Sequence, residues 1–400
     1  MSKLFFHHVA PAPADPIFGL MAEYKADPRK KKINLSVGVY RDENSLTPVL
    51  ESVKRAEEFL LQSEKTKEYL PIEGSKDFIE HVGALVFGDF FWMRERNRIC
   101  GVQSLGGSGA LRLGGDFLKQ EVGERIAISD PTWPNHRGIF SKCQMVVEAY
   151  PYYDLQRQRL EFERMYQYLK SCNPGTIVIL QPCCHNPTGA ELTMDEWKQL
   201  AQLFQKNGLL PFFDFAYQGF GLDLEEDAKV IRLFASEGLE MVVAASQSKN
   251  FGLYSERVGA LFILSESQKT SESVLSKIKT IIRTNYSNPP RHGALIVEHI
   301  LSKPELKQMW IEEVRGMRKR IEKIRKQLVS ELAPRSSKRD FRFLENRTGM
   351  FCFTGLEREE VERLKREFAI YMTLDGRMNL SDLNAVNLPY VVDAIITVIS

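Results

Sequence analysis

One lysine stands among hydroxyl groups, glycines and an arginine, directly after an apolar run. The stretch 246–259 reads S-Q-S-K-N-F-G-L-Y-S-E-R-V-G and follows Met241-Val-Val-Ala-Ala245. A lysine that acts as a nucleophile must reach a carbonyl carbon and lose its proton easily, and desolvation at a strand end lowers the pKa of an amine. Lys249 is therefore a candidate for covalent chemistry, and an ordinary loop lysine is the alternative.

A glycine-rich turn, Gly106-Gly-Ser-Gly109, opens what looks like a helix over residues 110–119. Free backbone N–H groups and the helix dipole at such a start can bind a phosphate group. The turn does not match the dinucleotide-binding pattern, because the sixth position from Gly107 is Arg112, and no Gly-Lys-Ser/Thr follows it. A phosphate cradle and a plain structural turn both fit these residues.

More phosphate partners lie beside the lysine. Ser246 and Ser248 offer hydroxyl donors, and Arg257 offers a guanidinium fork. With the free N–H groups of a helix start, these are the donors that a phosphate dianion requires.

A carboxylate and an amide follow two further apolar runs. Asp214 comes directly after Phe212 and Phe213, where a carboxylate is costly unless it is paired, although a helix cap or a loop aspartate is a common alternative. Asn186 lies in the turn C-H-N-P-T-G and could donate into the same cleft. A lysine, a phosphate cradle and an acid for a ring nitrogen are the three parts of a pyridoxal phosphate site. Together they predict that cofactor.

The elements that must position these side chains follow from the apolar runs. The runs are continuous rather than alternating, which is typical of strands covered on both faces in a mostly parallel sheet. We therefore expect an α/β fold whose large domain has a central sheet flanked by helices, with ligands bound beyond the carboxyl ends of the strands. The expected strands are 125–129, 176–180, 209–213, 241–245 and 260–264.

The C-terminal quarter has a different pattern. Apolar residues from Leu306 to Leu328 recur at spacings of three and four, which predicts one long amphipathic helix. A strand over 349–353 and a helix over 359–368 follow. With 400 residues, the chain is longer than one core usually supports, so we expect a second, smaller α+β domain.

Composition excludes several classes of protein. A net charge of +2 gives no reason to expect a nucleic-acid or membrane partner, and no apolar run approaches the roughly 20 residues of a membrane span. The first residues resemble neither a secretory signal nor a transit peptide, and the six cysteines form no C-x-x-C metal or redox motif. We therefore expect a cytoplasmic protein without a metal site.

From about Asp15 to the C-terminus the chain resembles the aspartate/aromatic aminotransferases, which are class I pyridoxal-phosphate-dependent aminotransferases of fold type I. The resemblance implies a small domain made of residues 15–46 and 305–400, a large cofactor domain of residues 47–304, and an arm of residues 1–14 that contacts the partner in a homodimer. The matching motifs are V-G-V-Y-R-D-E, Y-L-P-I-E-G, L-G-G-S-G-A-L, D-P-T-W-P-N-H, H-N-P-T-G, F-F-D-F-A-Y-Q-G-F, S-K-N-F-G-L-Y-S-E-R-V-G, Y-S-N-P-P and G-M-F-C-F-T-G-L.

The resemblance also implies roles around the cofactor ring. Lys249 matches the lysine that forms the Schiff base and moves the substrate's α-proton. Asp214 matches the partner of the pyridinium nitrogen, with His136 behind it. Tyr217 and Asn186 match the residues that hold the ring's phenolic oxygen, and Trp133 matches the residue that stacks on the ring. The catalytic candidates are Lys249, Asp214 and Tyr217.

The resemblance further implies a shared site for phosphate and substrate. Arg377 matches the arginine that clamps the α-carboxylate near Gly38, and Arg283 matches the arginine that reaches across the dimer to a side-chain carboxylate. The residues matched to the phosphate are Gly107, Ser108, Ser246, Ser248, Arg257 and, from the other subunit, Tyr69.

Three positions depart from the family's pattern. Gly106 stands where some members have serine, Gln181 where many have histidine, and Asp382 where a glycine is usual. The sequence resembles both branches of the family. The motifs L-G-G-S-G-A-L, P-C-C-H-N-P-T-G-A and D-G-R-M resemble the branch that acts on aromatic amino acids, whereas Val39, Thr47 and Asn288 resemble the aspartate branch.

We therefore expect amino transfer between L-aspartate, with L-tyrosine and L-phenylalanine as candidate further donors, and 2-oxoglutarate, by ping-pong half-reactions that give oxaloacetate or an aromatic oxo-acid and L-glutamate. An enzyme that prefers aromatic donors, and a racemase or β-decarboxylase on the same fold, stay open as alternatives. A nicotinamide-linked dehydrogenase is disfavoured by the failed dinucleotide pattern, and a binding protein without turnover would keep the same motifs.

Overall fold

Seven strands form one central sheet in the order β2-β10-β9-β8-β7-β3-β4. The computed structural model describes residues 5–11 and 16–400. Only β10 runs antiparallel to its neighbours β2 and β9, and the other pairs are parallel, which confirms the expected mostly parallel sheet. The strands of this sheet are β2 Ile99–Leu105, β3 Arg125–Asp130, β4 Val146–Pro151, β7 Ile177–Leu180, β8 Leu210–Phe215, β9 Met241–Ser246 and β10 Val258–Leu264.

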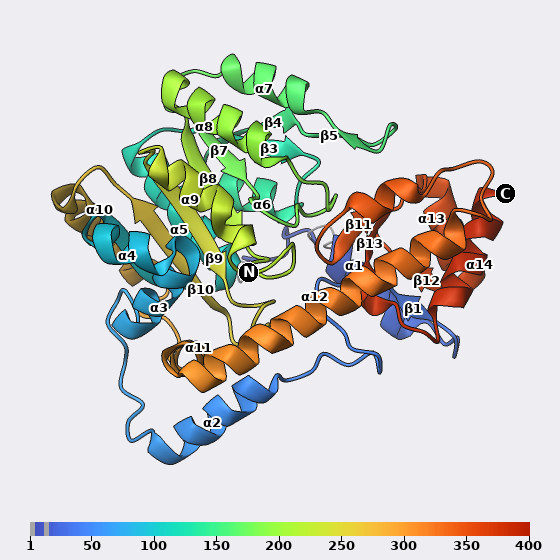
Figure 1. The fold of residues 1–400 in the computed structure, drawn as a ribbon, viewed down its shortest axis with the longest axis horizontal. Coiled ribbons are helices and arrows are strands. Elements are labelled where there is room, and N and C mark those ends of the chain that lie inside the picture. Colours follow the sequence, from blue (N-terminus) through green and yellow to red (C-terminus); the bar gives the residue numbers. More distant parts are fainter. Residues whose placement is uncertain (1–4, 12–15) are drawn as a thin grey trace.

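Helices cover both faces of this sheet (Figure 1). Alternate residues of β9 show the division, because Val242 and Ala244 pack in a core with α5, α6 and α10, whereas Met241, Val243 and Ala245 pack in a core that includes α3, α8 and α9. Burial on both faces is the reason that the strand sequences are continuously apolar. The helices are α1 Pro16–Ala26, α2 Glu51–Ser63, α3 Lys76–Phe87, α4 Asp89–Glu95, α5 Gly106–Glu121, α6 Asn135–Lys142, α7 Phe162–Lys170, α8 Met194–Asn207, α9 Lys229–Ser236, α10 Gln268–Asn285, α11 His292–Ser302, α12 Pro304–Leu332, α13 Arg358–Phe368 and α14 Leu388–Ile399.

The long helix predicted from the apolar stripe is α12, which begins with proline in its first turn. It runs from beside α11 and α2 to the C-terminal elements (Figure 1). Trp310 near its start stacks on Phe251 with ring centroids 4.3 Å apart, and its indole nitrogen donates to the Asn250 carbonyl. The helix is thereby anchored close to the lysine loop.

Segments from the two ends of the chain meet beside the large sheet. β1 (Ile33–Asn34) pairs in parallel with β12 (Ile370–Tyr371), and β11 (Phe351–Phe353) pairs antiparallel with β13 (Arg377–Asn379). A separate hairpin joins β5 (Tyr153–Asp154) to β6 (Arg159–Leu160). The exact domain boundaries stay a prediction.

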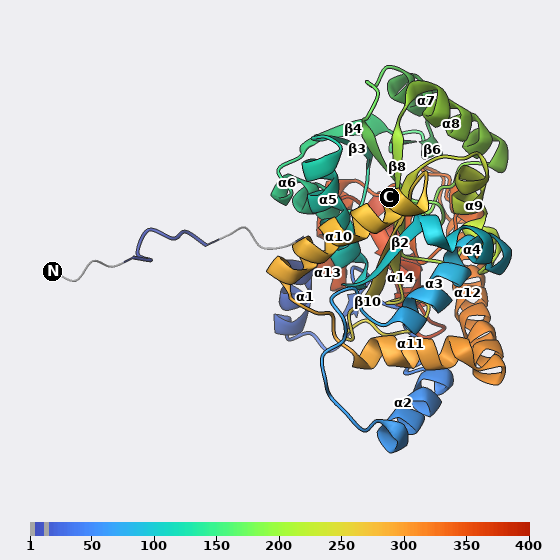
Figure 2. The same cartoon turned by 90° about the vertical axis from the view of Figure 1, so that its left-hand side faces the viewer.

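The predicted N-terminal arm, 1–14, is only partly described, because residues 1–4 and 12–14 lie outside the described residues. Residues 5–11 extend away from the rest of the chain (Figure 2). Phe5 and Phe6 in this segment are exposed.

The sheet brings the candidate residues to one edge. β2, β9, β8, β7 and β3 share one direction, so their carboxyl ends meet at the same side of the sheet. The glycine turn, Lys249, Asp214 and Asn186 follow or end four of these strands, and they therefore lie close together although they are distant in sequence.

Candidate active site

A cavity of about 430 Å³ lies at this edge of the sheet. Its volume is that of a site for a small molecule. Twelve of the fourteen residues predicted for the site line it: Gly38, Gly107, Ser108, Trp133, Asn186, Asp214, Tyr217, Ser246, Ser248, Lys249, Arg257 and Arg377.

Lys249 lies just beyond the end of β9. Its Nζ atom is 4.8 Å from the centroid of the Tyr217 ring. Burial lowers the pKa of Lys249 to about 8, an effect that the negative charge of Asp214 opposes and the positive charge of Arg257 increases. The amine can therefore lose its proton much more easily than an exposed lysine.

Asp214 is the fifth residue of β8 and is buried beside an imidazole. Its Oδ2 atom is 2.9 Å from Nε2 of His136, a residue that is fully buried. Nδ1 of His136 lies 2.7 Å from the hydroxyl of Thr132, which fixes the ring from the other side. This arrangement holds a carboxylate at a defined place in the cavity, where it can face a cationic ring nitrogen.

Tyr217 and Asn186 also line the cavity and contact each other. The Asn186 side-chain amide donates to the Tyr217 hydroxyl at 3.4 Å. Burial raises the pKa of Tyr217, and the charge of Asp214 raises it further, so the phenol keeps its proton and remains a donor. Gln181 brackets the Asn186 peptide, because its side chain accepts from the Asn186 N–H at 2.9 Å and donates to the Asn186 carbonyl at 3.1 Å. Gln181 thus positions Asn186.

The glycine turn and the serines lie together at the place where the sequence predicts an anion cradle. α5 begins at Gly106 without a side-chain cap, so the N–H groups of its first turn have no partner within the helix. Ser246 Oγ donates only to Ser248 Oγ, at 3.1 Å, among the described side chains. Gly106 has a φ of 67°, and a Cβ atom there would lie 2.8 Å from Nη2 of Arg257. Glycine at this position therefore leaves room for the guanidinium beside the turn.

Arg377 is the buried cation of the site, with 3% of its surface exposed. Its Nη2 donates to the Ser36 carbonyl at 2.8 Å and its Nη1 to Asn186 Oδ1 at 3.4 Å, and its guanidinium lies 4.6 Å from the Phe351 ring centroid. Its Nε has no hydrogen-bond partner among the described residues. The group is thus held in place with donor capacity left for an anion.

Two predicted residues lie outside the cavity of the single chain. Tyr69 is 90% exposed, and Arg283 is also exposed, with its guanidinium hydrogen-bonded to the Ser287 hydroxyl. The Asn288 side chain next to Ser287 donates to the Leu70 carbonyl at 2.7 Å, so the two exposed residues belong to adjoining segments.

Comparison with known proteins identifies the family. Residues 30–395 match the family model for aminotransferase class I and II. The chain belongs to this family. The aminotransferase is 45% identical over 395 residues to the aspartate aminotransferase of Haemophilus influenzae, with 98% of this chain and 100% of the relative covered. It is 42% identical over 391 residues to the aromatic-amino-acid aminotransferase of Escherichia coli, with 97% and 98% covered.

A solved structure agrees with the fold of the aminotransferase. The crystal structure of the aromatic-amino-acid aminotransferase of Burkholderia pseudomallei, an enzyme covalently bound to pyridoxal phosphate, superimposes on this chain with a TM-score of 0.96. The two chains are 43% identical, and 100% of each is covered. The α/β fold and the family that the motifs predicted are therefore confirmed, and the chain is a pyridoxal-phosphate-dependent aminotransferase. No helix among the described residues is long and apolar enough to cross a membrane.

Sequence reasoning missed part of the aminotransferase's cavity wall. Tyr254 and Phe351 line it, as do Met21, Val37, Leu111 and Ala216. The Phe351 ring packs edge-to-face on Tyr217 with centroids 6.2 Å apart, besides lying against Arg377. Tyr254 and Phe351 both lie within the matching motifs given above. Their residue types alone do not distinguish a cavity wall from an ordinary core position, so only the fold shows their place.

Proposed function

We propose that this aminotransferase moves the amino group of L-aspartate, and also of L-tyrosine or L-phenylalanine, to 2-oxoglutarate. The products are oxaloacetate or an aromatic oxo-acid, and L-glutamate. The observation that carries the proposal is one cavity in which a lysine of lowered pKa, a buried acid–imidazole pair and a buried arginine with a free donor meet.

The residues of the cavity fit pyridoxal phosphate. We assign the phosphate to the uncapped start of α5, at Gly107 and Ser108, together with Arg257 and the hydroxyls of Ser246 and Ser248. In this assignment Asp214 would pair with the ring nitrogen, and Tyr217 and Asn186 would hold the phenolic oxygen. Trp133 would stack on the ring, and Lys249 would form the covalent bond. When bound, the cofactor supplies the electron sink that makes the α-proton of an amino acid acidic.

Each of the chain's own residues then has a defined task. Lys249 Nζ takes the α-proton of the substrate and returns it during product formation, which requires an amine that loses its own proton far more easily than an exposed lysine. Asp214, supported by His136, keeps its negative charge facing the ring nitrogen. Tyr217 donates from its hydroxyl, which the raised pKa keeps protonated. The burial of these groups strengthens each electrostatic contact because water is excluded.

Substrate carboxylates have two arginines available in this proposal. Arg377 binds the α-carboxylate beside Gly38, using the donors that the protein leaves free. Arg283 binds the side-chain carboxylate of aspartate or 2-oxoglutarate from the partner subunit of a homodimer. An aromatic donor has no second carboxylate, so Arg283 must lie aside for it to bind.

The homodimer belongs to the proposal because the single chain leaves the predicted site incomplete. Tyr69 and Arg283 lie on the surface outside the cavity, and Phe5 and Phe6 in the N-terminal segment expose apolar rings. A partner subunit that receives the arm and contributes both side chains accounts for these features together. The division into residues 15–46 with 305–400 and residues 47–304, and the cytoplasmic location, stay predictions.

The experiment that tests the function is a panel of amino donors. The purified protein, loaded with pyridoxal phosphate, is supplied with 2-oxoglutarate and aspartate, tyrosine, phenylalanine or alanine, and glutamate and the oxo-acid are quantified together. We expect equal amounts of glutamate and of the matching oxo-acid, with aspartate and at least one aromatic donor above alanine. A D-amino acid or a decarboxylated product in place of the oxo-acid would favour a racemase or a β-decarboxylase.

A further inference from the structure

The loop Ser36–Arg41 forms one wall of the substrate side of the cavity. Val37, Gly38 and Val39 line the cavity together with Arg377. The loop follows β1 and contains neither a helix nor a strand, so contacts other than a regular backbone ladder must fix its position. That position determines how much room is left for a substrate carboxylate beside Arg377.

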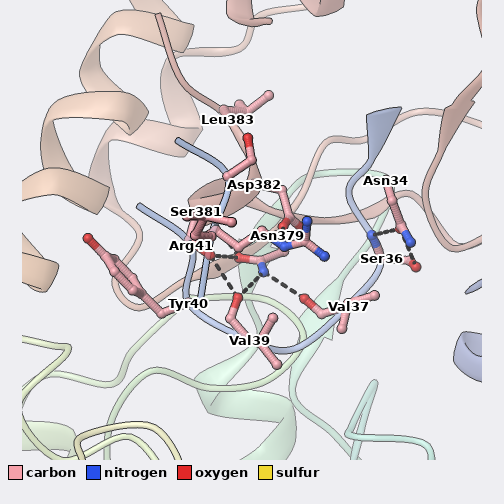
Figure 3. Close-up of polar contacts among 12 residues, drawn as sticks. Asn34, Ser36, Val37, Val39, Tyr40, Arg41, Asn379, Ser381, Asp382 and Leu383 are labelled. Atoms are coloured by element: carbon pink, nitrogen blue, oxygen red, sulfur yellow. Dashed lines mark hydrogen bonds and ion pairs between the residues drawn. The ribbon is translucent and has the colours of Figure 1, made fainter. Parts of the chain in front are cut away.

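Side chains from β13 and the turn after it hold the loop (Figure 3). Asn379 Nδ2 donates to the carbonyls of Val37 and Val39 at 2.6 and 2.8 Å, and the Ser381 hydroxyl donates to the Val39 carbonyl at 2.9 Å. Arg377 itself donates to the Ser36 carbonyl. The carbonyl groups of the loop are thus bound by residues from the same segment that carries the carboxylate-binding arginine.

An ion pair closes the end of the loop. Arg41 Nε lies 2.9 Å from Oδ1 of Asp382, whose side chain is 2% exposed, whereas that of Arg41 is 29% exposed. Neither carboxylate oxygen accepts a regular hydrogen bond from a described residue. Arg41 is therefore the main compensation for burying this charge, and the compensation exists only while the loop is docked.

Few other charged groups face Asp382. Arg320 of α12 donates to the carbonyls of Ser381 and Asp42 and forms an ion pair with Glu43. These contacts leave Arg41 as the direct ion-pair partner of Asp382. The hydroxyl of Tyr254, which lines the cavity, accepts from the Tyr40 N–H at 2.8 Å.

Protonation would weaken the pair. Burial raises the pKa of Asp382 to about 8, although Arg41, the nearby Asn379 amide and Arg320 oppose the shift. The carboxyl group therefore gains its proton, and the pair loses its charge, as the pH falls through that value.

We propose that Asp382 is a positioning residue for the amino-acid substrate, which holds the loop Ser36–Arg41 against β13 through Arg41 and so shapes the carboxylate site around Arg377. This inference rests on the proposed function only for its kinetic readout. By the resemblance, Asp382 stands where a glycine is usual, so the family's motifs do not imply the ion pair with Arg41.

The first test is hydrogen exchange, which needs no turnover. In the cofactor-loaded protein at about pH 9, where Asp382 is ionised, Asp382→Asn should increase exchange in peptides that cover the loop Ser36–Arg41 and leave peptides of β8 and β9 unchanged. Asp340→Asn is the control, because it breaks an exposed ion pair, with Arg342, away from the site. Unchanged exchange in the loop of Asp382→Asn would overturn the proposal, even if none of the amino donors were turned over.

The second test is the KM for aspartate as a function of pH. Asparagine resembles the protonated acid, so the ratio of the KM of Asp382→Asn to that of the wild type should be near one at about pH 6 and rise to about tenfold at about pH 9. A tenfold effect lies between the effect expected for an exposed ion pair and that expected for a fully buried one. The ratio cancels titrations common to both proteins, such as that of Lys249. A ratio that stays constant across this range, or a change in kcat alone, would mean that Asp382 has only a structural role.

Two further variants separate the ion pair from folding. Asp382→Glu keeps the charge and should restore low exchange in the loop and a KM within about threefold of the wild type, which is the scale of a surface ion-pair effect. Arg41→Gln should reproduce the loop exchange of Asp382→Asn, and it replaces that variant if Asp382→Asn does not fold. Normal loop exchange in Arg41→Gln would contradict the proposal.

Discussion

The substitution Arg377→Gln tests the carboxylate site most severely. Arg377 is 3% exposed, and its guanidinium is held by the Ser36 carbonyl and by Asn186 Oδ1 and retains an Nε without a partner among the described residues. Glutamine keeps a polar side chain of similar width but removes the positive charge and the planar fork. A substrate α-carboxylate would then be buried without its counter-charge.

The size of the effect follows from this burial. Truncating one partner of a buried, hydrogen-bonded charge pair costs about 2–5 kcal/mol. At about 1.4 kcal/mol for each factor of ten, kcat/KM should fall by about 30-fold to several thousand-fold. The loss should be the same for aspartate and phenylalanine, because both carry the α-carboxylate that Arg377 is proposed to bind.

The assay is kcat/KM for both donors against 2-oxoglutarate, together with the dissociation constant of pyridoxal phosphate. Cofactor affinity should stay within about threefold of the wild type, because Arg377 is not among the residues assigned to the phosphate. A loss below about threefold for both donors, or a loss confined to aspartate, would refute the assignment of Arg377 to the α-carboxylate.

Two further predictions concern the other arginine and the lysine. Arg283→Gln should lower kcat/KM for aspartate by about 30-fold or more and leave phenylalanine nearly unchanged, because only aspartate has a second carboxylate; equal losses for the two donors would exclude this role. The rate at which the cofactor-free protein captures pyridoxal phosphate covalently should rise with pH, reach half of its plateau near pH 8 and level off above it, because burial lowers the pKa of Lys249 to about 8. A rate that keeps rising toward the pKa of about 10.4 of an exposed lysine would show that the amine is not desolvated.

The elements that build the site could be predicted because their sequences carry a local physical pattern. Strands buried on both faces must be continuously apolar, and this pattern located β3, β7, β8, β9 and β10. Polar side chains at the ends of such strands are costly unless they are hydrogen-bonded or paired, so Asp214 and Lys249 became candidates for a shared site. The parallel sheet then brought them together at one edge.

Other elements had weaker patterns. β2 and β4 were missed, since Cys100-Gly-Val-Gln-Ser104 has polar residues within the strand and β4 is partly exposed. α5 begins at Gly106, four residues before the predicted start, because the glycine turn is itself helical. Glycines give no helical pattern, and the N–H groups that matter for the phosphate lie in this first turn.

Contacts between the two ends of the chain could not be predicted from the sequence. The pairing of β1 with β12 and of Arg41 with Asp382 joins segments that no local periodicity connects. Asp382 was noted only as a departure from the usual glycine, and its partner became evident from the fold. Tyr69 and Arg283 are a different case, because their proposed contacts need a second subunit.

The central claim is that Lys249 carries the cofactor, and it can be measured directly. The loaded protein is reduced with borohydride, digested and examined by mass spectrometry for peptides that carry a phosphopyridoxyl group. The account predicts that the group is found on Lys249 and that Lys249→Ala shows no labelled peptide. A label on another lysine of the wild type, with Lys249 unmodified, would contradict it.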